Sequence, residues 1–222
     1  MNIQHHLQPE TLMAYAAGTL PAAMALVVGC HAERCNQCRQ ELRSAEALGG
    51  RMLETVAAKP LPEAARNNVM ALLDQQPLPD RAQAEPVATA SVDDAGSFLP
   101  RRLKSLLGID NYNQLKWRKL APGIEKFNLP LDEGKSFMLR IGAGLAMPVH
   151  THKGTELTLL LQGGYHDKLG SFHMGDVADL DSSVEHQPVA FDDEPCICLA
   201  GMDAGLRFKG WIPTLMKPLT GL

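Results

Sequence analysis

The spacing of apolar residues changes along the chain from a helical repeat to a strand-like one. In residues 1–76 the good helix formers Ala, Leu, Met and Glu dominate. After Trp117, short apolar runs at 137–141, 157–161 and 197–199 alternate with Gly, Pro and Asp turns. Such alternation is typical of an all-β sandwich or barrel. The pattern therefore predicts a helical first part and an all-β second part.

The first part is expected to begin with two helices. Pro9 opens the first helix and Gly18 ends it, because proline suits the first helical position and glycine suits a helix end. Pro21 opens the second helix, which is expected to run to about Ala47. The glycine pair at 49–50 then allows a break.

A third helix and a linker are expected next. Apolar residues follow Pro62 at helical spacing: Ala65, Val69, Leu72 and Leu73. Residues 77–97 are rich in Pro, Ala, Ser, Thr and acids without periodicity, which is typical of a linker. A short helix is expected over 99–107. We therefore divide the chain into a helical domain (1–85), a linker (86–99) that lets the two domains sit apart, and a β domain (100–222).

Composition narrows the functional class. The chain is 45% hydrophobic and 21% charged, which is ordinary for a globular protein with a core. Its net charge of −4 argues against direct nucleic-acid binding. Two charged runs are interpreted as solvated surface: a basic one over 101–119 and an acidic one over 176–194.

The sequence predicts a cytoplasmic protein that does not span a membrane. Its first nine residues contain no Lys or Arg, unlike the start of a signal peptide. The apolar stretch 20–30 is shorter than the roughly 20 residues that cross a bilayer. Because the cytosol is reducing, the odd number of five cysteines indicates metal binding or redox chemistry rather than a disulfide framework.

The first candidate metal motif is His31-x3-Cys35-x2-Cys38. On one continuous helix, positions i, i+4 and i+7 share a face, so the three side chains would point the same way. Tetrahedral zinc needs a fourth ligand. His5 or His6 could supply it from a folded-back N-terminal segment, and the physics of the sequence does not separate the two.

The second candidate motif is a His-x-His-x3-Glu pattern bracketed by glycines within 144–163. His150 and His152 are two residues apart, so on a strand they face the same side. Glu156 follows after a short turn, and His186 lies where a returning hairpin would bring a fourth ligand. This pattern resembles the first motif of metal-binding cupin barrels, with a degenerate second motif around His186. Such ligands suit zinc, copper, iron or nickel, and the carboxylate adds manganese.

Other cysteines and histidines have less specific interpretations. Cys196 and Cys198 point to the same face of a strand, so they are either two core residues or an oxidation-sensitive pair. Cys30 is interpreted as a small buried residue. His166 and His173 are interpreted as ordinary surface or strand residues.

The two metal motifs together resemble a known family. The N-terminal histidines, the stretch Tyr15-Ala-Ala-Gly18-Thr-Leu and the motif ending at Cys38 are similar to the zinc-binding anti-sigma domain of the ChrR group. The cupin motif and the Cys-x-Cys pair follow in the order of that group. The resemblance implies a multidomain α and β protein, in which a small zinc-binding helical domain joins an all-β cupin barrel.

The resemblance also implies a function. It makes His6, His31, Cys35 and Cys38 the ligands of the N-terminal zinc, and it implies zinc in the cupin site. The helical domain would clamp between the two polymerase-binding domains of an extracytoplasmic-function sigma factor. The cupin would receive an oxidative signal such as singlet oxygen and end the sequestration.

Two other functions compete with this one. A cupin with three His and one Glu could be a metal-dependent dioxygenase or isomerase that uses iron, manganese or nickel, with the helical part as a dimerisation module. An enzyme gives no reason for a second, cysteine-bearing site. A DNA-binding regulator is disfavoured by the negative net charge.

Overall fold

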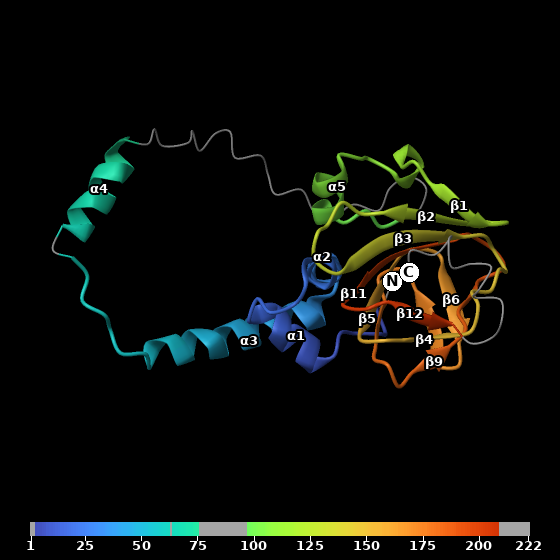
Figure 1. Cartoon of the computed structure of the whole chain (residues 1–222), viewed down its shortest axis with the longest axis horizontal. Coiled ribbons are helices and arrows are strands. Elements are labelled where there is room, and N and C mark those ends of the chain that lie inside the picture. Colours follow the sequence, from blue (N-terminus) through green and yellow to red (C-terminus); the bar gives the residue numbers. More distant parts are fainter. Residues whose placement is uncertain (1–2, 63, 76–96, 209–222) are drawn as a thin grey trace.

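The computed structural model of the chain describes residues 3–62, 64–75 and 97–208. Figure 1 shows a helical N-terminal part beside a C-terminal barrel of strands, as the change in periodicity predicts. The described helices are α1 (Pro9–Ala16), α2 (Ala22–Ala32), α3 (Asn36–Glu54), α4 (Ala65–Gln75) and α5 (Arg101–Leu107), and a 3-10 turn spans Tyr112–Gln114.

The expected first and third helices, and the short one before the barrel, are confirmed. α1 begins at Pro9 and ends before Gly18, which adopts a left-handed φ of 68° that favours glycine. α4 contains the four apolar residues whose spacing predicts it, and α5 lies within the expected range 99–107.

The prediction of one continuous second helix is wrong. Its sequence forms two helices, because Cys35 takes an extended conformation and caps α3 with its own sulfur, which accepts a hydrogen bond from the backbone N–H of Cys38. The glycine pair at 49–50 does not break the chain and lies inside α3. A glycine costs only about 1 kcal/mol in a helix, so it does not force an end.

The strands of the described residues form three antiparallel sheets. The largest has the order β1-β2-β3-β11-β5-β8, and the smaller two are β10-β6-β7 and β12-β4-β9. The expected runs at 137–141, 157–161 and 197–199 are confirmed as parts of β3, β5 and β11. The strand bounds are β1 Arg118–Ala121, β2 Ile124–Asn128, β3 Lys135–Ile141, β4 His150–His152, β5 Glu156–Gln162, β6 Gly164–Asp167, β7 Gly170–His173, β8 Val177–Leu180, β9 Glu185–His186, β10 Val189–Ala190, β11 Cys196–Met202 and β12 Leu206–Phe208.

The strand β5 is buried on both faces, and the alternation of its side chains places Glu156 inside the barrel. Leu157, Leu159 and Leu161 join a core that they share with the helices. The alternate residue Leu160 belongs to the barrel core. Because successive side chains point to opposite faces, Glu156 shares the inner face with Leu160.

α2 packs directly on the outer face of the large sheet. Val27 and Val28 of α2 lie in one core with Leu199 of β11. The helix backbone comes so close that a side chain at Gly201 would collide with the carbonyl of Ala23. The expectation that the two parts sit apart is therefore wrong for α2, because its apolar face has no other core to enter.

The expected linker lies largely outside the described residues. Its last residues, Ser97 to Leu99, are described and buried, and the backbone N–H of Phe98 donates to the carbonyl of Leu161 on β5. α4 precedes residues 76–96, which are not described, and Figure 1 shows it standing away from the barrel and from α1 and α2. Among the residues described, no helix is both long enough and apolar enough to cross a membrane.

Candidate metal centres

The first cluster assembles at the turn between α2 and α3. His31 lies in the last turn of α2, Cys35 caps α3, Cys38 lies in the first turn of α3, and His6 comes from the segment before α1. One ligand atom from each of the four lies within 4.8 Å of the others. The prediction that the last three share one helix face is wrong, because the chain turns at Cys35.

The structure separates the two N-terminal histidines. The Nδ1 atom of His6 lies 3.3 Å from the Cys35 sulfur and 3.8 Å from the Cys38 sulfur. His5 turns to the barrel instead, where its ring stacks on Phe172 with centroids 4.0 Å apart. His6 is therefore the histidine that geometry assigns to the cluster.

His31 is held in the form that binds a metal. Its Nδ1 lies 3.0 Å from the carbonyl oxygen of Gly175, which can only accept, so Nδ1 carries the proton. The lone pair of Nε2 then faces the Cys38 sulfur at 3.3 Å. Burial lowers the pKa of His31 to about 4, so the imidazole is neutral near pH 7.

Asp176 anchors the N-terminal segment that carries His6. Its carboxylate accepts the backbone N–H groups of Gln4 at 2.7 Å, His5 at 3.1 Å and His173 at 2.8 Å. The side chain is 1% exposed. The interpretation of the acidic run as solvated surface is wrong for Asp176, because three backbone donors replace its water.

The spacing of the first cluster fits a tetrahedral ion. A tetrahedron with metal–ligand bonds of about 2.0–2.3 Å has edges of about 3.3–3.8 Å. The distances from His6 to both sulfurs and from His31 to Cys38 are 3.3, 3.8 and 3.3 Å. Burial raises the pKa of the Cys38 thiol to about 12, so a cation is needed to make it a thiolate at neutral pH.

The second cluster lies inside the barrel. His150 of β4 pairs with His186 of β9, and their Nε2 atoms are 3.1 Å apart. Ring nitrogens of His150, His152 and His186 lie within 4.8 Å of one another. Glu156 starts β5 beside them, with Oε2 3.6 Å from the Nε2 of His152. The structure thus brings together the three histidines that the motif predicts and places Glu156 against one of them, His152.

The outer nitrogen of each histidine faces an oxygen. The Nδ1 of His150 contacts the carbonyl of Pro148 at 2.9 Å, and that of His152 contacts the carbonyl of Asp181 at 3.3 Å. The Nδ1 of His186 contacts the carboxylate of Asp167 at 2.8 Å. With the protons on Nδ1, the three Nε2 lone pairs point inward, which is the usual arrangement of metal-binding histidines.

Two further observations fit a cation at this point. Among the described residues, the Nε2 of His152 and Oε2 of Glu156 are buried without a hydrogen-bond partner, which is costly. Burial also lowers the pKa of both His150 and His186, so protonation does not relieve the contact between their lone pairs. A bound metal ion would satisfy all four ligand atoms at once.

The second cluster borders a small, mostly apolar cavity of about 50 Å³. Phe137 and Met147 line it, together with Cys196 and Cys198. Both thiols are free and buried. Their mutual hydrogen bond, together with burial, raises the pKa of Cys196. His166 and His173 are exposed and outside the cluster, as expected.

Sequence reasoning missed the residues that orient the ligands. Asp167 holds His186, Asp176 holds the segment of His6, and the carbonyl of Gly175 holds His31. A carboxylate far along the chain carries no local signal, and a backbone carbonyl carries none at all. Among these residues, Gly175 carries a sequence signal only through its type, because its left-handed φ of 97° favours glycine.

Comparison with known proteins agrees with this architecture. The ChrR Cupin-like domain family matches residues 109–204. The anti-sigma-E factor ChrR of Cereibacter sphaeroides (strain ATCC 17023) is 40% identical over an alignment of 222 positions that covers 98% of each chain. A chain in the crystal structure of Rhodobacter sphaeroides SigE in complex with the anti-sigma ChrR superimposes with a TM-score of 0.76 at 37% identity, over 91% of this chain and 100% of that one. This chain therefore belongs to the family of ChrR anti-sigma factors.

Proposed function

We propose that the protein is a cytoplasmic anti-sigma factor that binds an extracytoplasmic-function sigma factor and removes it from the pool available to RNA polymerase. The related ChrR is solved in complex with SigE, which supports a partner of the same kind here. Membership of a family of anti-sigma factors favours this regulatory function over the dioxygenase or isomerase.

The observation that carries the proposal is the exposed apolar surface of α3 and α4. Within the described residues, none of the side chains of α4 is buried. Val69, Leu72 and Leu73 are 56%, 61% and 59% exposed and lie on one helical face. Met52 and Leu53 at the end of α3 are 64% and 74% exposed. An apolar face of this kind marks a site for a protein partner.

We assign zinc to the N-terminal cluster, because two thiolates and two imidazoles are a common tetrahedral zinc set. His6, His31, Cys35 and Cys38 would hold it. Bound there, zinc supplies folding free energy to a region with little core of its own. The four ligands come from three segments, so their joint fixation sets the direction in which α3 leaves the barrel.

We assign the second metal to His150, His152, His186 and Glu156, with zinc as the family resemblance implies. The ligand chemistry also admits iron, manganese or nickel. In the proposed function this site receives the oxidative signal, of the singlet-oxygen type, that ends sequestration. The free thiols Cys196 and Cys198 on the same cavity support such a role.

The first experiment is a capture of tagged protein from its native cells, with and without a chelator. Sigma factor present without chelator and absent with it is the expected result. A Leu73→Glu variant should lose the sigma factor, whereas Asn67→Glu, also exposed on α4, should keep it. Capture of no sigma factor in any sample would refute the proposal. Oxygen consumption that depends on His150 would favour the enzyme.

A further inference from the structure

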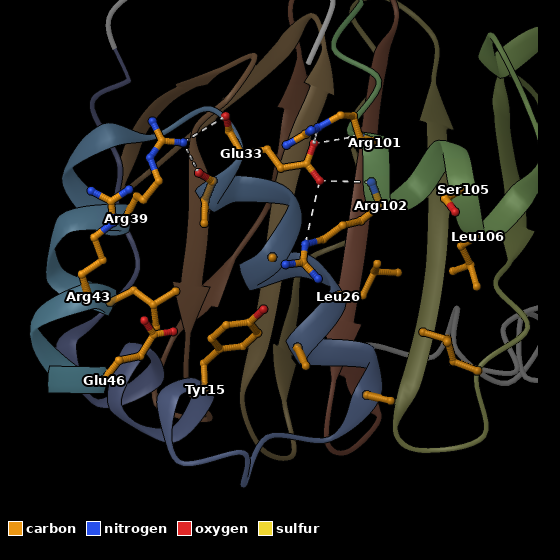
Figure 2. Close-up of a pocket in the computed structure, with 16 residues that line it drawn as sticks. Tyr15, Leu26, Glu33, Arg39, Arg43, Glu46, Arg101, Arg102, Ser105 and Leu106 are labelled. Atoms are coloured by element: carbon orange, nitrogen blue, oxygen red, sulfur yellow. Dashed lines mark hydrogen bonds and ion pairs between the residues drawn. The ribbon is translucent and has the colours of Figure 1, made fainter. Parts of the chain in front are cut away.

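A groove of about 980 Å³ crosses the junction of the two domains (Figure 2). α2 forms its floor, α3 forms one wall and α5 forms the other. The helices α2 and α3 belong to the predicted helical domain, and α5 belongs to the predicted β domain. A molecule bound in this groove would therefore contact both domains at once.

The floor and walls of the groove are shaped for a helix. Ala22 and Ala25 lie on one face of α2, so this part of the floor is low enough for another backbone to come close, while the side chain of Arg102 covers Gly29 at the far end. Leu42 of α3 and Leu106 of α5 provide apolar walls. Leu106 is 38% exposed. A trough of small residues between apolar walls suits an amphipathic helix, a common mode of peptide recognition.

The rim of the groove is positively charged. Four arginines line it: Arg39 and Arg43 on α3, and Arg101 and Arg102 on α5. Only two acids, Glu33 and Glu46, accompany them, which leaves a surplus of two positive charges. Figure 2 shows the arginines on both walls.

Glu33 is engaged within the protein and does not cancel the rim. Its carboxylate accepts the backbone N–H groups of Arg101 at 2.7 Å and Arg102 at 3.0 Å. The guanidinium groups of the same arginines lie 3.8 and 3.9 Å away. The Glu33 side chain is 7% exposed, whereas those of Arg101 and Arg102 are 45% and 58% exposed. The guanidinium groups thus remain accessible to an incoming carboxylate.

We propose that this groove binds an acidic amphipathic helix of the sigma factor, with an apolar stripe on the floor and carboxylates against the arginines of both walls. This rests on the proposed function. It is supported by continuity with the surface assigned to the sigma factor. Leu42 faces the groove, and Leu53, eleven residues later, lies on the same face of α3 and is 74% exposed. The two leucines therefore point the same way along α3, with Glu46 and Gly49 between them on that face.

The groove gives the β domain a direct contact with the partner. Because α5 precedes the barrel and is tied to α2 through Glu33, a shift of the barrel against α2 would move one wall of the groove. The affinity for the sigma factor then depends on α5 as well as on α3 and α4.

The test uses the full chain and its sigma factor in a binding titration. Leu106→Glu on the groove wall and Arg43→Glu on its rim are each expected to weaken binding about tenfold. Matched controls lie outside the groove: Leu169→Glu, whose leucine is 41% exposed, and Lys116→Glu, also exposed. Both should bind as wild type. The salt dependence of binding should fall in Arg43→Glu, since one charge pair is lost.

A photo-crosslinking residue in place of Ser105 identifies the occupant. The expected product joins the protein to a segment of the sigma factor with acids beside an apolar helical stripe. If wild type binds the sigma factor and both groove variants bind equally well, the groove proposal fails and the proposed function stands. If wild type binds no sigma factor, both fail. Binding of RNA or DNA that Arg43→Glu abolishes would also overturn it.

Discussion

The Nδ1 atom of His31 donates a hydrogen bond to the carbonyl oxygen of Gly175 at 3.0 Å, so the turn before β8 orients a residue of the N-terminal cluster. At the other end of β8, the carbonyl of Asp181 accepts from His152 of the barrel cluster at 3.3 Å. Residues 175–181 therefore carry outer hydrogen-bond partners for both clusters. A change in this segment is expected to reach both.

Asp176→Asn should weaken the N-terminal cluster. The amide replaces one accepting oxygen with an NH2 group, which must then face a backbone N–H donor in a buried place. We expect a loss of about 1–3 kcal/mol in the free energy of unfolding. Zinc affinity should fall about 10- to 100-fold, as for other outer-shell changes.

Urea denaturation and competition with a chromophoric chelator measure the two effects of Asp176→Asn. Asp193→Asn, at an exposed acid of the same run, is the control and should change neither quantity. Wild-type zinc affinity in Asp176→Asn would mean that the N-terminal segment holds His6 without help from Asp176.

Cys35→Ser should remove the N-terminal zinc and abolish capture of the sigma factor, while the cupin stays folded. The change deletes a ligand and also the sulfur that caps α3. Cys30→Ala is the matched control, because Cys30 is equally buried but lies outside the cluster. It should keep its zinc. The measurements are the metal content and the sigma-factor affinity of both variants. If Cys35→Ser bound the sigma factor with wild-type affinity, the structural role of the zinc would be refuted.

The barrel cluster could be predicted from the sequence because its chemistry is local. His150, His152 and Glu156 are separated by two and four residues, and the alternation of a strand and a short turn brings them to one side. His186 required only a later strand that pairs with β4, which β9 supplies. The strands could be located from their short apolar runs, because this signal also comes from residues that are neighbours in the sequence.

The N-terminal cluster was harder to predict from the sequence, because its geometry depends on tertiary contacts. The expected continuous helix was wrong at Cys35, where a sulfur cap competes with helix propensity. Position alone could not separate His5 from His6, and packing of His5 on Phe172 decides between them. The docking of α2 on the sheet could not be predicted from the sequence either, because the apolar pattern of a helix does not indicate which surface it packs against.

Lys126→Met should change how stability depends on pH. Burial lowers the pKa of Lys126 from 10.5 to about 8, with the charges of Lys135 and Arg118 acting in the same direction. Below pH 8 the Lys126 side chain is protonated in both the folded and the unfolded state, so the full cost of burying its charge lowers the stability of the fold. Between pH 8 and 10.5 the folded state loses the proton first, so the stability of the wild type rises with pH.

The Lys126→Met variant should lack this rise, which urea denaturation at several pH values can measure. Its stability relative to wild type should therefore be highest below pH 8 and decline towards pH 10.5. Lys116→Met, at an exposed lysine, is the control and should follow the wild type. Parallel pH curves for wild type and Lys126→Met would show that the charge is not penalised in the fold.

Asp167→Asn should weaken metal binding in the barrel alone. Its carboxylate contacts the Nδ1 of His186 at 2.8 Å and is buried. The amide oxygen can still accept that proton but carries no charge, so the imidazole becomes a weaker ligand. We expect metal affinity to fall about 10- to 100-fold at this site. Chelator titration should show one weakened and one unchanged site per chain, and weakening of both would point to general unfolding.

His150→Ala should separate sequestration from response. The residue lies inside the barrel, away from the exposed faces of α3 and α4, so binding of the sigma factor should persist. Loss of one of the barrel ligands should blunt the release that follows oxidative stress. A reporter gene driven by the sigma factor, measured with and without singlet oxygen, tests this in cells. His166→Ala, at an exposed histidine of the same barrel, should respond as wild type. A fully responsive His150→Ala strain would remove the barrel metal from signal reception, whereas constitutive reporter activity would show that the barrel metal is needed for sequestration itself.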